Sequence, residues 1–123
     1  MQHDNSFLSL VEECRPFVKE VGIDFVKEKL EKKEEDFTLI DVREDYEWNQ
    51  GHIPTAIHLS RGVIERDIEK AIPNKNTNIV LYCGGGFRSV LSAFNLQKMG
   101  YTNVISMDGG MRDWLNSGNK VVL

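Results

Sequence analysis

The chain has 123 residues, which suits one domain that needs no metal or disulfide to hold it together. Its net charge of −4 argues against a nucleic-acid partner, and no apolar run approaches the ~20 residues that span a membrane. Segment 1–5 lacks the basic and apolar parts of a secretory signal, and two cysteines are too few for a disulfide framework, so we expect a cytoplasmic protein.

The first half of the chain predicts two helices, two strands and a helical turn. In chain order they are a helix over about 6–17 that ends near Pro16, a strand over 17–21, a helix over 23–35, a strand over 37–42 and a turn over 43–49. In the second helix we expect Phe25, Val26 and Leu30 to face inward, with the charge run over 27–35 as a solvated surface.

The second half continues the alternation of strands and helices. The expected elements are strands over 56–59, 78–82 and 103–106, and helices over 62–71, 88–99 and 111–116. Alternating elements with short connections predict an α/β fold, in which helices cover both faces of a mostly parallel sheet. Ligands of such sheets bind at the carboxyl ends of the strands, and Cys83 directly follows the clearest strand of the chain.

Cys14 belongs to the apolar stripe of the first helix, together with Phe7, Leu10 and Val11. We therefore expect a buried core thiol. The alternative is a resolving thiol that pairs with Cys83.

The segment Cys83-Gly84-Gly85-Gly86-Phe87-Arg88 joins a nucleophile to groups that favour negative charge. The thiolate is the reactive form of cysteine, and a free thiol titrates at about pH 8.5. The thiolate is favoured by three features: glycine amides that can curl into an anion-binding nest, the N-terminus of the next helix, and the permanent cation of Arg88. We also expect the glycines to leave the sulfur uncovered. An inert buried thiol is the alternative, but it rarely needs such neighbours.

Formal charge is distributed unevenly along the chain. Residues 1–50 carry 14 acidic and 7 basic side chains, whereas residues 51–123 carry 5 acidic and 8 basic ones. The basic half contains the cysteine loop, which suits a small anionic substrate.

The spacing between Cys83 and Arg88 separates two chemistries. Cysteine-based phosphatases place five residues between Cys and Arg, whereas this chain has four. The tighter loop suits a smaller target, a sulfane sulfur. A phosphatase also needs a general acid, and Asp41 and Asp108 are available. A small cysteine-dependent phosphatase or arsenate-type reductase is therefore kept as an alternative.

Four segments, in order, resemble the single-domain rhodanese family. They are Leu39-Ile40-Asp41-Val42-Arg43-Glu44, Glu47-Trp48-Asn49-Gln50-Gly51-His52-Ile53-Pro54, Cys83-Gly84-Gly85-Gly86-Phe87-Arg88-Ser89 and Met107-Asp108-Gly109-Gly110-Met111-Arg112-Asp113-Trp114. With their spacing they cover the chain from about Val18 onward. Thr55 and Ser60 stand where the family usually has glycine and proline, and both departures affect a turn.

The resemblance implies a three-layer α/β/α sandwich around a five-stranded, mostly parallel sheet, with an extra N-terminal helix. We expect a helical extension over 1–17 and a rhodanese-like domain over 18–123. The resemblance also implies an enzyme of the thiosulfate sulfurtransferase type that uses no metal or organic cofactor.

The resemblance assigns roles to the residues around Cys83, which becomes the persulfide carrier. The substrate-binding residues are Gly84, Gly85, Gly86, Phe87, Arg88 and Ser89. Asp41 and Arg43 support the pocket from the neighbouring strand end. A surface ion pair of Arg43 with Glu44 or Glu47 is an equal alternative.

The expected reaction has two halves. Cys83 takes a sulfane sulfur from thiosulfate or a persulfide donor, and then passes it to cyanide, a small thiol or a protein thiol. A rhodanese scaffold that serves as a protein-binding or sulfur-relay module is the alternative. The intact Cys83 disfavours a module that only binds, since a pure scaffold needs no thiol there.

Overall fold

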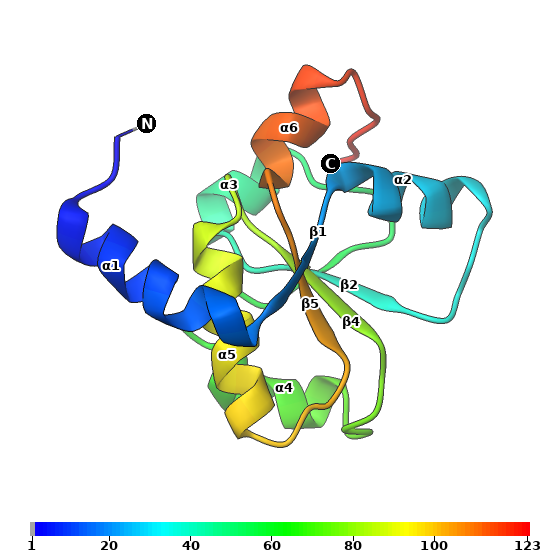
Figure 1. Cartoon of the computed structure of the whole chain (residues 1–123). Helices are drawn as coiled ribbons and strands as arrows, with labels where there is room; N and C mark the ends of the chain where they lie inside the picture. Colours follow the sequence, from blue (N-terminus) through cyan, green and yellow to red (C-terminus); the bar gives the residue numbers. More distant parts are fainter. Residues whose placement is uncertain (1) are drawn as a thin grey trace.

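A sheet of parallel strands forms the centre of the structure, a computed structural model that describes residues 2–123 (Figure 1). The strands are β1 (Lys19–Val21), β2 (Thr38–Asp41), β3 (Ile57–His58), β4 (Ile79–Tyr82) and β5 (Val104–Met107). The helices are α1 (Asn5–Cys14), α2 (Ile23–Glu31), α3 (Asp45–Asn49), α4 (Ile64–Ala71), α5 (Phe87–Lys98) and α6 (Gly110–Asn116), with a 3-10 turn η1 (Arg15–Phe17). Their order in the sheet is β1-β5-β4-β2-β3, and every pairing is parallel, so the predicted α/β fold with an added N-terminal helix is confirmed.

Two apolar cores lie on opposite faces of this sheet. β4 shows the division best, because Ile79 and Leu81 join one core, whereas Val80 and Tyr82 join the other. Helices α1, α4 and α5 supply the first core, and α2 and α6 supply the second. All four β4 side chains are buried, as a central strand covered on both faces requires.

Helix α1 packs along α5, at the left of Figure 1. Val11 is fully buried there and Cys14 is 7% exposed, so the expected core thiol is confirmed. Both cysteines are free thiols, and no disulfide joins them. Leu10, on the same apolar stripe, is 46% exposed.

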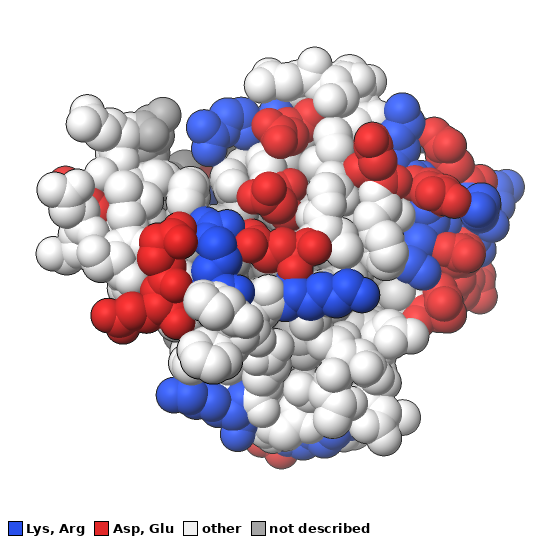
Figure 2. Space-filling view, in the orientation of Figure 1, with Lys and Arg blue, Asp and Glu red and all other residues white. Residues whose placement is uncertain are grey.

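The second helix is shorter than predicted. It ends at Glu31, because Lys33 adopts a left-handed backbone with φ of 54°. Val26 is buried as expected, but Phe25 is 37% exposed and its ring lies against the Lys29 ammonium instead of in the core. Figure 2 shows Lys and Arg interspersed with Asp and Glu over α2, which is the expected solvated surface.

Several other boundaries also differ from the sequence prediction, by one to three residues. Pro16 lies inside η1 rather than at the end of α1, since a 3-10 turn can start with a residue that has no N–H. Helix α5 begins one residue earlier than predicted, at Phe87. None of the helices over residues 2–123 is long and apolar enough to cross a membrane.

Candidate functional site

The loop that carries Cys83 leaves the carboxyl end of β4, the middle strand of the sheet. Cys83 is buried and 1% exposed, so the expectation that the glycines leave its sulfur uncovered is wrong. The loop instead folds over the sulfur, and the amide of Gly86 donates to Sγ at 3.1 Å. Gly86 has a φ of 101°, which only glycine adopts without strain. The sulfur therefore rests against a hydrogen-bond donor that stabilises negative charge.

Helix α6 fixes the orientation of the loop peptides. The amides of Met111 and Arg112 donate to the carbonyls of Cys83 and Gly84, at 2.8 and 2.9 Å. A trans peptide points its C=O and its next N–H in opposite directions, so the N–H groups of Gly84 and Gly85 point away from α6. Neither amide is hydrogen-bonded within residues 2–123, and both remain available to an anion.

Close contact between α6 and the loop depends on Gly110. A Cβ at this position would collide with the carbonyl oxygen of Cys83 and lie 2.7 Å from the carbonyl carbon of Gly84. Gly110 also has a φ of 55°. The second glycine of the Gly109-Gly110 pair is therefore required by the loop as well as by the helix start.

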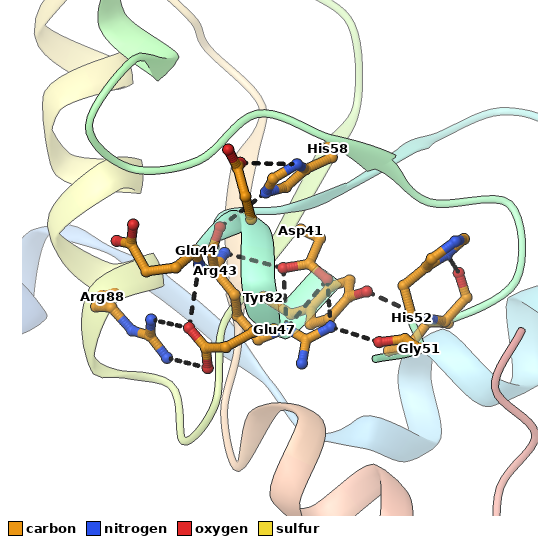
Figure 3. Close-up of polar contacts among 11 residues, drawn as sticks. Asp41, Arg43, Glu44, Glu47, Gly51, His52, His58, Tyr82 and Arg88 are labelled. Carbon is orange, nitrogen blue, oxygen red and sulfur yellow. Dashed lines mark hydrogen bonds and ion pairs between the residues drawn. The ribbon is translucent and has the colours of Figure 1, made fainter. Parts of the chain in front are cut away.

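Arg88, the last residue of the loop, is held by a carboxylate from α3. Its Nη1 and Nη2 donate to Oε1 and Oε2 of Glu47 at 2.7 and 3.1 Å (Figure 3). These hydrogen bonds raise the pKa of Arg88 above its ordinary value, and the negative charge of Cys83 acts in the same direction. Burial opposes the charged form of Glu47, but hydrogen bonds from Arg88 and the Glu44 backbone outweigh it, so the pKa of Glu47 is lowered. Arg88 is thus a fixed cation beside the sulfur.

Two buried serines form a chain of polar contacts that starts at the sulfur of Cys83. Ser89, in the first turn of α5, has its Oγ 3.5 Å from Sγ of Cys83 and 2.7 Å from Oγ of Ser106 on β5. Both serines are fully buried. Ser106 therefore orients the hydroxyl that faces the sulfur.

Asp41 and Arg43 form a buried pair at the end of β2, visible in Figure 3. Nη2 of Arg43 donates to Oδ2 of Asp41 at 2.7 Å and to the carbonyl of Gly51 at 2.8 Å. Arg43 is 6% exposed and Asp41 is fully buried. The alternative of a surface ion pair between Arg43 and Glu44 or Glu47 is wrong, because a buried guanidinium takes the carboxylate two residues away on its own strand end.

Asp108, one of the two candidate general acids, also lies at this edge of the sheet. Its Oδ1 would be 3.3 Å from a Cβ built on Gly86. Asp41, the other candidate, is already engaged by Arg43. Only Asp108 is therefore placed beside the loop and free of that pairing.

Several residues near the loop were not singled out by the sequence interpretation. The sequence assigns Glu47 a role only as an alternative partner of Arg43, and it assigns Ser106, Arg112 and His3 no role at the site. His3 packs edge-on against Phe87 with ring centroids 4.8 Å apart, and Arg15 lies over the same ring at 5.7 Å. The N-terminal segment thus reaches the loop, which no local pattern in the sequence indicates.

A family model described as "Rhodanese-like domain" matches residues 23–117. "Putative sulfur carrier protein YrkF" of Bacillus subtilis is 33% identical over 97 residues, which are 79% of this chain and 51% of that protein. "Putative sulfurtransferase YtwF" of the same organism is 38% identical over 97 residues, 79% of this chain and 90% of that protein. The chain therefore spans about half the length of the first relative and most of the second.

Solved structures show the same fold. A rhodanese-like domain protein from Staphylococcus aureus superposes with a TM-score of 0.72 at 30% identity, over 79% of this chain and 91% of that one. A protein from Rhodopseudomonas palustris, described as "Possible Tyrosine Phosphatase", superposes with a TM-score of 0.88 at 22% identity, over 99% of this chain and 98% of that one. At that identity the second similarity concerns the fold alone.

Proposed function

The chain belongs to the rhodanese-like domain family, and from this membership we propose that it is a sulfurtransferase that carries a sulfane sulfur as a persulfide on Cys83. The proposed donor is thiosulfate or a persulfide. The proposed acceptor is cyanide, a small thiol or a protein thiol.

The observation that carries this proposal is the set of hydrogen-bond donors that the loop offers at and near Cys83. The Gly86 amide already contacts Sγ, and the amides of Gly84 and Gly85 point away from α6 without a partner within residues 2–123. Arg88 adds a guanidinium that Glu47 holds in place beside Gly84 of the loop. Such a site stabilises a thiolate, a persulfide anion and the oxyanion end of a small donor.

In the first half-reaction the Cys83 thiolate attacks the outer sulfur of thiosulfate. The new S–S bond to Sγ forms as the bond between the two thiosulfate sulfurs breaks, and sulfite departs with the electron pair. Arg88 and the loop amides lower the cost of the charge that moves onto the leaving group. Charge and atoms balance without an external oxidant.

Asp41 and Arg43 have a supporting part in this proposal. Their pair ties the end of β2, which lies beside β4 in the sheet, to the Gly51 carbonyl after α3. Neither group has a role at the sulfur itself. We therefore expect them to act on loop geometry and stability.

The direct test is intact-protein mass spectrometry after incubation with thiosulfate and removal of reductant. We expect a gain of one sulfur atom in the wild-type protein and no gain in Cys83→Ser. Cys14→Ser is the matched control, since it removes the other thiol, and it should still acquire the sulfur. An unmodified wild-type protein under these conditions would contradict the proposal.

A phosphatase is the second candidate, because Asp108 stands beside Gly86 as a general acid would. Four residues between Cys83 and Arg88 disfavour it. Hydrolysis of an aryl phosphate faster than persulfide formation, lost in Cys83→Ser, would reverse the ranking. A scaffold that only binds a protein partner would instead keep its function in cells when Cys83 is replaced by alanine.

A further inference from the structure

A cavity of about 440 Å³ adjoins the outer side of the Cys83 loop. The N-terminal segment, the loop and the start of α6 build its wall, which includes His3, Leu8, Gly85, Phe87, Arg112 and Asp113. Gly85 and Phe87 flank Gly86, whose amide contacts the sulfur of Cys83. A molecule in this cavity would therefore lie against the loop that covers the sulfur, and Cys83 itself is not part of the wall.

Arg112 places a cation on the wall of this cavity. Its backbone amide donates to Gly84, and its guanidinium lies so close to Gly85 that a Cβ there would collide with Nη2. Carboxylates engage four other arginines of the chain, namely Arg15, Arg43, Arg66 and Arg88. No ion pair or hydrogen bond from residues 2–123 engages the Arg112 guanidinium. It is therefore available to a carboxylate on a ligand.

Asp113 places an anion on the same wall. Its carboxylate lies against Gly109, where a Cβ would collide with Oδ2. Among the described residues it forms no ion pair, and the neighbouring Arg112 is not within pairing distance. The cavity thus presents one cation and one anion side by side, and neither neutralises the other. This arrangement fits a zwitterion, such as the ammonium and carboxylate of an amino acid.

The rest of the wall is largely apolar. Phe87 offers its ring, His3 packs edge-on against that ring at 4.8 Å, and Leu8 adds an aliphatic surface. A short aliphatic segment between the zwitterionic end and the sulfur of a ligand would contact these groups.

We infer that this cavity binds the acceptor of the persulfide sulfur, and that the acceptor is a low-molecular-weight thiol with an amino-acid end. Its carboxylate binds Arg112 and its ammonium binds Asp113. This inference rests on the proposed function. The acceptor thiolate attacks the outer sulfur of the Cys83 persulfide, and a new S–S bond forms as the bond to Sγ breaks. The electron pair returns to Cys83 as the thiolate, and the outer sulfur leaves with its proton on the acceptor.

The test uses four thiols that share a short chain and differ in their charged groups. Cysteine carries both groups, 3-mercaptopropionate only the carboxylate, cysteamine only the ammonium, and 2-mercaptoethanol neither. Protein loaded with thiosulfate and desalted is mixed with each thiol, and loss of the persulfide is followed by intact mass. Each variant is compared with wild type for the same thiol, so the intrinsic reactivity of that thiol cancels.

In Arg112→Gln we expect discharge by cysteine and 3-mercaptopropionate to slow about tenfold relative to the other two thiols. In Asp113→Asn, discharge by cysteine and cysteamine should slow relative to discharge by the other two thiols. Arg66→Gln, which removes an exposed charge outside the cavity, is the matched control. In the wild type, the discharge rate should saturate with cysteine and stay linear with 2-mercaptoethanol.

The inference would be overturned if each variant slowed discharge by the same factor for all four thiols. It would also be overturned if the wild-type discharge rate rose linearly with cysteine concentration. The wild-type measurement decides even if a variant fails to fold. A protein that takes up no sulfur from thiosulfate would remove the proposed function and this inference with it. A persulfide that forms but discharges without preference would remove this inference alone.

Discussion

Arg88 at the end of the cysteine loop and Glu47 at the start of α3 form a two-pronged ion pair across 41 residues of sequence. Their side chains are 29% and 19% exposed, so the pair is partly shielded from water. Nη1 and Nη2 both donate to one carboxylate, which fixes the plane of the guanidinium. The cation beside the sulfur therefore has a set position before any donor binds.

Glu47→Gln should lower the free energy of unfolding at pH 7 by about 1 kcal/mol, since a partly exposed pair is screened by solvent. The pKa of Glu47 is lowered in the folded protein. The pair's contribution is therefore complete above the unfolded value of about 4.3 and is lost as pH falls through the lower folded value. Urea titrations of both proteins from pH 7 to 3 check this. A difference that stays constant below pH 4 would contradict it.

Arg88→Met should slow persulfide formation from thiosulfate about a hundredfold, because the leaving sulfite loses its cation. Arg88→Lys keeps the charge but loses the planar fork that Glu47 holds, so we expect a loss of about tenfold. The concentration dependence of the adduct rate, measured by mass spectrometry, gives both values. Equal rates in wild type and Arg88→Met would show that the cation has no part in the reaction.

Gly110→Ala should disrupt the loop, because the new Cβ would collide with the carbonyl of Cys83. Gly118 is the matched control, since it also has a positive φ of 74° but open space around it. Gly118→Ala should cost about 1 kcal/mol of stability from backbone strain and keep persulfide formation. Gly110→Ala should lose at least about 1 kcal/mol more, together with most of the adduct rate. Thermal unfolding and the mass assay separate the two effects.

Ser106→Ala should slow persulfide formation about threefold, because the Ser89 hydroxyl loses the partner that orients it toward the sulfur. Ser92→Ala is the control for removing a buried hydroxyl. Ser92 is also fully buried, but its Oγ has no hydrogen-bond partner among the described residues. That change should leave the adduct rate at the wild-type level. Equal rates for the two variants would argue against the serine pair.

Asp41→Asn should lower the free energy of unfolding by about 3 kcal/mol, because it leaves the guanidinium of Arg43 buried without its counter-charge. Replacing both residues, with Asp41→Leu and Arg43→Met, should cost less than the single change, since no buried charge remains. Chemical denaturation of the three proteins tests this order. A double variant less stable than Asp41→Asn would contradict it.

The order of elements and the identity of the cysteine loop could be read from the sequence alone. Hydrophobic periodicity is a local property of the sequence. A few residues are therefore enough to predict the strand over Ile79–Tyr82 and the helix after it. The run of glycines between Cys83 and Arg88 likewise indicates, from the sequence alone, a loop that can bind an anion. The end of α2 at Glu31 could not be predicted, because the left-handed Lys33 that follows it leaves no periodic signal in the sequence.

Tertiary structure decided which partners these residues take. Parallel strands bring together segments that are far apart in the chain, so Glu47 meets Arg88, Gly110 meets the Cys83 carbonyl, and His3 meets Phe87. It also decided that the sulfur is covered, because access depends on what packs over the loop and not on how small the loop residues are. The sequence shows which groups can stabilise an anion. The positions and directions of these groups depend on how α3, α6 and the N-terminal segment pack around the loop.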